Sequence, residues 1–124
     1  MRVLPLAAIT LGACTSGEPK GDVTCEPHGT RLHIAVLASK THTFTTDCLA
    51  APADQRFTIK FDNQDTSSHG NRNIHIYESP EKFVGESVIH GRSITYTVPA
   101  MLRGSYVFRC DEHPSLMNGV FIVK

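Results

Sequence analysis

Short runs of alternating apolar and polar residues, separated by turns, dominate this chain from about residue 24 onward. A period of two places one side of a strand against a core and the other side toward solvent. The runs with this pattern are residues 32–37, 57–61, 94–98 and 106–110. The turns recur about every eight to twelve residues, a spacing that favours a sandwich over alternating strands and helices. We therefore predict an all-β Greek-key sandwich of two antiparallel or mixed sheets.

Two further segments refine this fold. The last six residues, Gly119-Val-Phe-Ile-Val-Lys124, are apolar on both faces, as expected for a central strand covered by the other sheet. A short helix would fit only between Pro80 and Val88.

Length and charge exclude several classes of function. A chain of 124 residues has room for one domain. Twelve Lys and Arg balance twelve Asp and Glu, so the basic excess that phosphate neutralisation requires is absent and we expect no nucleic-acid partner. The sequence shows no catalytic triad, no paired carboxylates and no phosphate-binding glycine loop, so we do not expect an enzyme.

The N-terminus has the layout of an export signal, with one positive charge followed by apolar and small residues. Its end, Leu11-Gly-Ala-Cys14, resembles the lipobox of bacterial lipoproteins, in which the signal is cut before the Cys and its sulfur carries a lipid. We expect export to the periplasm or the outer face of the membrane, with a lipid anchor on Cys14. Plain secretion and a frayed apolar N-terminus are the alternatives.

These features predict three regions. Residues 1–13 form the signal peptide, residues 14–23 form a flexible tether of small polar residues, and residues 24–124 form the folded domain that contains the motifs described next.

The most informative segment contains three metal-binding side chains. Cys110, His113 and Met117 lie within eight residues, on one Pro-containing loop between two predicted strands. Zinc, magnesium and calcium prefer other donors than Met, whereas a Cys, two His and a weak axial Met form a blue-copper site. The alternative is a core Cys beside a surface His and a core Met. The alternation argues against it, because Cys110 shares the inward face with Tyr106 and Phe108.

The surrounding sequence resembles the cupredoxins, the family of plastocyanin, azurin and amicyanin. The matching motifs are Gly104-x-Tyr-x-Phe-x-Cys110-x-x-His113-Pro-x-x-x-Met117-x-Gly119, Phe61-Asp-Asn63 and Asn73-Ile-x-Ile-Tyr77. The resemblance implies a cupredoxin sandwich that holds one type 1 copper ion and transfers single electrons between redox partner proteins.

The fourth copper ligand is open. Family members usually have His directly before the Asn at position 73, but this chain has Arg72, which cannot ligate a metal. His75 points outward if Ile74 and Ile76 face the core. We therefore favour His69, in the preceding loop. A shifted strand register would favour His75 instead, and a third possibility is that neither histidine binds.

The resemblance gives Asn73 a role as well. In this family the Asn at this position bonds to the Cys loop and stiffens the metal site. The alternative is a strand-end Asn in a turn.

Two cysteines remain after Cys14 and Cys110 are assigned. In an exported chain we expect Cys25 and Cys48 to form a disulfide, with two reduced thiols as the alternative.

The remaining histidines and a group of arginines are interpreted as surface residues. The histidines without ligand partners at useful spacing are His28, His33, His42 and His90. The arginines, expected as solvated charge near the copper end, are Arg72, Arg103 and Arg109.

Three functions follow from these residues. We favour a monomeric, lipid-tethered electron carrier with one copper ion. The second hypothesis is a copper-binding module for storage, delivery or sensing, which a site lacking the usual His would suit. The third is a structural relative without metal. A visible band from thiolate to Cu(II) charge transfer would separate the first from the others.

Overall fold

The fold of the chain is all-β. The computed structural model describes residues 23–37, 42–65, 70–77 and 83–124, and within these ranges it contains no helix. The strands are β1 (Arg31–Val36), β2 (Cys48–Ala51), β3 (Phe57–Asn63), β4 (His75–Tyr77), β5 (Phe83–Val84), β6 (Ser93–Val98), β7 (Gly104–Arg109) and β8 (Asn118–Val123). The predicted fold class is confirmed.

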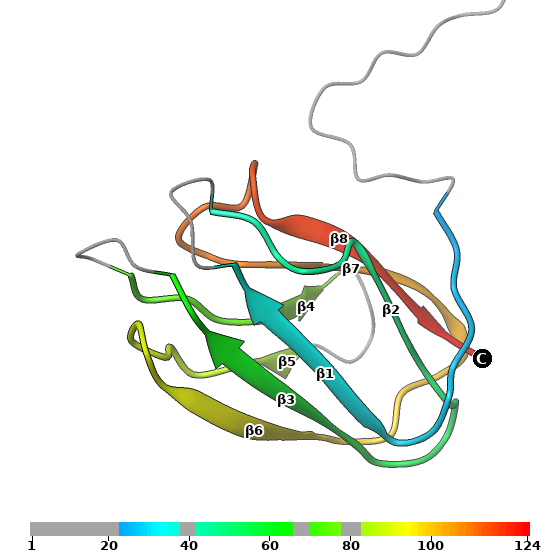
Figure 1. Ribbon diagram of the computed structural model, residues 1–124. Helices are drawn as coiled ribbons and strands as arrows, with labels where there is room; N and C mark the ends of the chain where they lie inside the picture. The colour runs from blue at the N-terminus through cyan, green and yellow to red at the C-terminus, as the bar shows by residue number, and fades with distance from the viewer. Residues whose placement is uncertain (1–22, 38–41, 66–69, 78–82) are drawn as a thin grey trace, which may run out of the picture.

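The strands form two mixed sheets that pack as the layers of a sandwich (Figure 1). One sheet has the order β1-β3-β6, and the other has the order β2-β8-β7-β4-β5. Each contains one parallel pair, β1 with β3 and β2 with β8, and the other pairs are antiparallel. Strands distant in sequence therefore lie side by side, which brings several loops together at each end.

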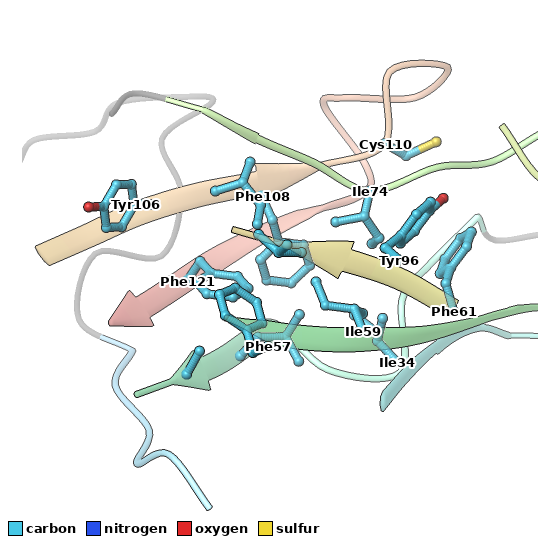
Figure 2. Packing of buried hydrophobic residues seen from close by; sticks show 14 of the residues in the cluster. Ile34, Phe57, Ile59, Phe61, Ile74, Tyr96, Tyr106, Phe108, Cys110 and Phe121 are labelled. Atoms are coloured by element: carbon cyan, nitrogen blue, oxygen red, sulfur yellow. The ribbon is translucent and has the colours of Figure 1, made fainter. Parts of the chain in front are cut away.

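The core lies between the two sheets and is rich in aromatic rings. Alternate residues of β3, namely Phe57, Ile59 and Phe61, are buried, as the period of two predicts. The ring of Phe57 lies 5.6 Å from that of Phe121 in the facing sheet. Figure 2 shows Cys110 at one end of this layer of side chains, with Tyr106 toward the other end.

Strand β8 is central, as its apolar sequence predicts, because it pairs with β2 on one side and β7 on the other. Strand β2 was not predicted, since its sequence Cys-Leu-Ala-Ala is short and does not alternate. The expected helix is wrong for its described part: β5 occupies Phe83–Val84, and residues 85–88 are not helical.

The predicted disulfide is confirmed. Cys25 and Cys48 are bonded, with their Cα atoms 6.1 Å apart, and they join the N-terminal segment to β2. The same segment contacts the C-terminus, because Lys124 Nζ donates to Glu26 Oε2 at 2.7 Å. The described residues form no helix that is long and apolar enough to cross a membrane.

Asp62 of β3 links the strands of the smaller sheet. His33 of β1 lies with its Nε2 2.6 Å from Asp62 Oδ2, and the Ser93 hydroxyl of β6 donates to Oδ1. The hydrogen bonds from Ser93 and His33 lower the pKa of Asp62, so the ionised form is favoured in the folded state.

Replacing Asp62 with Asn should lower the free energy of unfolding by about 1 kcal/mol at about pH 5. The loss is this small because His33 is exposed and solvent screens its charge. A carboxyl whose pKa is lower in the folded state stabilises the fold above its unfolded pKa, and this contribution disappears as pH falls through the folded pKa. The difference between the two proteins in urea unfolding should therefore shrink as the pH is lowered below the ordinary aspartate pKa of 3.8.

The control for this experiment is Asp54→Asn, which changes an exposed carboxylate in a turn and should shift stability by less than about 0.5 kcal/mol. If the two proteins differ in free energy of unfolding by the same amount at every pH, the ionised Asp62 carboxylate does not have this stabilising role.

Candidate metal centre

The loop between β7 and β8 brings two sulfur-containing side chains to the end of the core. Cys110 directly follows β7 and Met117 directly precedes β8, and both are completely buried. The N–H of Cys110 donates to the carbonyl of Met117 at 3.0 Å, and the N–H of Met117 donates to the carbonyl of His113 at 2.8 Å. The loop is thus closed by its own backbone, and Cys110 is a free thiol.

Gly119 fixes the path of the chain as it leaves this loop. A Cβ atom at Gly119 would lie 2.5 Å from the carbonyl oxygen of Asp47 and 2.6 Å from the ring of Phe108. Only glycine allows the backbone to approach both so closely. This contact explains the glycine two residues after Met117.

His113 lies at the surface end of the loop and contacts a second histidine. Its ring is partly exposed and stacks on the ring of His42, with centroids 4.3 Å apart and an angle of 14° between the planes. Burial lowers the pKa of His113, and the charges of Arg72 and His42 lower it further, which favours the neutral imidazole. A neutral imidazole is the form that binds a metal.

Arg72 is buried beside these rings, with 1% of its surface exposed. Its Nη2 donates to Asp65 Oδ2 at 2.8 Å and lies 3.0 Å from His42 Nδ1. Its Nη1 donates to the carbonyl of Asn71 at 2.6 Å, while its Nε has no hydrogen-bond partner in the described part of the chain. The expectation that Arg72 is a solvated surface charge is therefore wrong, because Asp65 compensates its charge inside the protein.

Asn63 at the end of β3 holds this ion pair in place. Its side-chain Oδ1 accepts from the N–H of Asp65 at 3.0 Å, and its Nδ2 donates to the carbonyls of Gly70 and Val88. Val88 also exchanges two backbone hydrogen bonds with Arg72, of 3.0 and 2.8 Å. The motif Phe61-Asp-Asn63 thus positions the segments that carry both charges.

Asn73 connects the strand segment before β4 to the Cys110 loop. It is buried, and its Oδ1 accepts from the N–H of Asp111 at 2.9 Å, while its Nδ2 donates to Asp111 Oδ2 at 3.0 Å. Nδ2 also donates to the carbonyl of Gly85 at 3.0 Å. Asn73 therefore fixes the residue that directly follows Cys110.

His75 lies between the fully buried Ile74 and Ile76, beside Arg109 in the register of β4 and β7. Its Nδ1 lies 2.9 Å from Asp111 Oδ1, and Arg109 is also paired with Asp111. Burial alone would raise the pKa of Asp111, but the hydrogen bonds from His75 and Asn73 outweigh burial, so this pKa lies below its usual value.

The favoured fourth ligand, His69, lies outside the described residues, as do Cys14, the signal peptide and most of the tether. His42, interpreted as a surface residue without ligand partners, is only partly exposed, and its ring is stacked on that of His113. No local signal marks it: His42 follows β1 in a different loop, far from the motif in sequence. In the described ranges, no three His, Cys, Asp or Glu side chains lie close enough together to hold a metal.

A family model for the cupredoxin-like domain matches residues 7–123. The chain is a cupredoxin. The match extends over nearly the whole sequence, and the two-sheet sandwich described above agrees with it. A comparison with curated protein sequences gives no match.

Solved structures with the same fold include two auracyanins. The dithionite-reduced auracyanin of Roseiflexus castenholzii is 21% identical, with a TM-score of 0.64, over 77% of this chain and 97% of that one. Auracyanin A, a "blue" copper protein of Chloroflexus aurantiacus, is 17% identical, with a TM-score of 0.63, over 78% of this chain and all of that one.

A third similar structure is much larger. The copper-containing nitrite reductase of Thermus scotoductus is 23% identical, with a TM-score of 0.56, over 98% of this chain but only 27% of that one. At these identities the three similarities establish the sandwich fold of this cupredoxin.

The donor set of this cupredoxin fits copper. A buried thiol, a buried thioether and an imidazole with a lowered pKa come from one closed loop, and soft donors of this kind select copper. Arg72 departs from the family pattern, because a guanidinium stands directly before Asn73, where a fourth donor is usual.

Replacing Asn73 with Ala should destabilise the protein by about 2 to 3 kcal/mol, because the part-buried N–H of Asp111 and the carbonyl of Gly85 lose their partner. Chemical denaturation measures this loss. The matched control is Asn118→Ala, which removes an exposed amide that donates to Pro114 at 2.9 Å in the same loop and should cost less than about 1 kcal/mol. Equal losses in the two variants would show that Asn73 does not anchor the loop.

Proposed function

We propose that this cupredoxin transfers single electrons through one copper ion held by Cys110, His113 and Met117. The observation that carries this proposal is the closed loop that buries the Cys110 thiol and the Met117 thioether together at the end of the core. A soft pair of sulfur donors with a nearby imidazole is suited to copper and poorly suited to the other common metals.

Each donor would have a separate role. Cys110 would be the dominant ligand, since a thiolate binds copper covalently, His113 would supply a nitrogen, and Met117 would supply a weaker thioether bond. When bound, copper supplies one-electron exchange between Cu(I) and Cu(II). The protein's contribution is rigidity: the loop's backbone hydrogen bonds and the contacts of Asn73 hold the donors in one arrangement, so little has to reorganise when the electron moves.

For the fourth ligand we propose His69. The position of His75 supports this choice, because His75 alternates with the buried Ile74 and Ile76 and its Nδ1 already contacts Asp111 at 2.9 Å. His75 remains the alternative, and a site with three protein donors is the third possibility.

We further propose that the protein is exported and anchored by a lipid on Cys14, in the periplasm or on the outer face of the membrane. Its partners would be redox proteins that donate and accept one electron. It would act as a monomer and not as an enzyme.

A second candidate function is copper storage, delivery or sensing without redox turnover. The burial of Arg72 favours it, because a site with a guanidinium in place of a fourth donor exchanges its metal more readily. The visible spectrum of the Cu(II)-loaded protein separates the two, since an intense thiolate charge-transfer band supports the electron carrier.

Substitution of the three proposed ligands should give graded effects. Cys110→Ala should abolish the visible band and tight copper binding, and His113→Ala should admit water and alter the band. Met117→Leu should retain copper and raise the reduction potential, because loss of a thioether donor disfavours the oxidised ion.

The control for Met117→Leu is Met101→Leu, another buried methionine, which lies outside the loop and should leave spectrum and potential unchanged. Spectroscopy and voltammetry on the copper-loaded proteins measure these effects. Copper binding that survives Cys110→Ala unaltered would refute the proposed site.

The fourth ligand can be identified by two histidine substitutions. His69→Ala should erase the visible band, whereas His75→Ala should leave it nearly unchanged, as should substitution of the exposed His90. The reverse result would assign the role to His75. A band that survives both substitutions would indicate a site with three protein ligands.

Lipid anchoring is tested by Cys14→Ser, which should move the protein from the membrane fraction to the soluble fraction of the producing cells. Mass spectrometry of the unchanged protein should find the lipid on an N-terminal Cys14. A soluble, unmodified parent protein would replace the anchor with plain secretion.

A further inference from the structure

Arg72 is a buried cation next to the proposed copper ligands, and the chain is fixed on both sides of it. Its backbone is paired with Val88, and the next residue, Asn73, is bonded to Asp111 directly after Cys110. These contacts on both sides fix the position of Arg72 relative to the Cys110 loop.

The guanidinium charge is held close to the donors. Arg72 Nη2 lies 3.0 Å from His42 Nδ1, and the His42 ring stacks on the ring of His113 at 4.3 Å. A single imidazole therefore separates the cation from a proposed copper ligand. The pair with Asp65 reduces the field of Arg72 but does not cancel it, because the two charges occupy different positions.

Two physical effects both favour Cu(I) over Cu(II) at this site. A thiolate, an imidazole and a thioether are a soft set that suits Cu(I). A fixed positive charge nearby repels Cu(II) more than Cu(I), because the oxidised ion carries one more positive charge. Low dielectric strengthens this difference, since Arg72 and Asp65 are both removed from solvent.

We propose that Arg72 is a specificity-determining residue that biases this site toward Cu(I) and so raises its reduction potential. The inference rests on the copper site proposed above and adds a property to it: the residue in place of a ligand tunes the metal through its charge. A protein that accepts the electron from this site would accordingly have to be a comparatively strong one-electron oxidant.

The experiment compares charge changes of opposite sign. In the full-length protein, the affinities for Cu(I) and for Cu(II) are each measured by competition with a chelator of that ion, and their ratio is followed. Arg72→Gln, which removes the cation and leaves Asp65, should raise the Cu(II) to Cu(I) affinity ratio at least about tenfold, equivalent to a fall in potential of about 59 mV.

Asp65→Asn, which removes the compensating anion, should lower the same ratio several-fold. A merely structural role for the pair would move both variants in the same direction. Arg72→Lys keeps the charge and should restore most of the parent ratio. The control Arg103→Gln removes an exposed arginine and should leave the ratio unchanged.

The outcomes separate this inference from the function on which it rests. If the parent protein binds copper but the ratio does not respond to Arg72→Gln and Asp65→Asn with opposite signs, the charge effect is refuted and the copper site stands. If the parent binds neither ion, the proposed function fails and the inference fails with it. If Arg72→Gln does not fold, the proposal is tested with Asp65→Asn and Arg72→Lys alone. A Cu(II) to Cu(I) affinity ratio that rises in Asp65→Asn would then overturn it.

Discussion

The buried ion pair of Arg72 and Asp65 constrains the end of the sandwich at which the Cys110 loop lies. Removing two charges from water costs several kcal/mol for each ion, and only close pairing with further hydrogen bonds offsets that cost. Asn63 provides much of this support, because it bonds to the segments of both Asp65 and Val88. The loops at this end are therefore tied together by a polar network whose members depend on one another.

The sequence predicted those strands whose own residues show a pattern of alternating or two-sided hydrophobicity. Alternation identified β3, β6 and β7, and two-sided hydrophobicity identified the central strand β8. It did not identify β2, whose four residues lack alternation and are stabilised by parallel pairing with β8. It also allowed a helix where β5 forms, because pairing of two residues with β4 has no signature in the sequence.

The residues of the candidate site were likewise predicted only where a local pattern marks them. Cys110, His113 and Met117 were identified because they lie on one short loop, and the inward direction of Cys110 followed from the parity of β7. The burial of Arg72 and the stacking of His42 on His113 were missed. Both involve His42, which lies 30 residues before Arg72 and 71 residues before His113, and no local pattern reports contacts over such separations.

The position of the N-terminal segment has a consequence for orientation. Glu26 is paired with Lys124, and Figure 1 shows this segment beside the C-terminus, on the side of the sandwich away from the loop between β7 and β8. A protein held at a bilayer through a lipid on Cys14 would be attached by that side. The loop between β7 and β8 would then face outward into the surrounding solution, where diffusing partners could reach His113 without approaching the lipid surface.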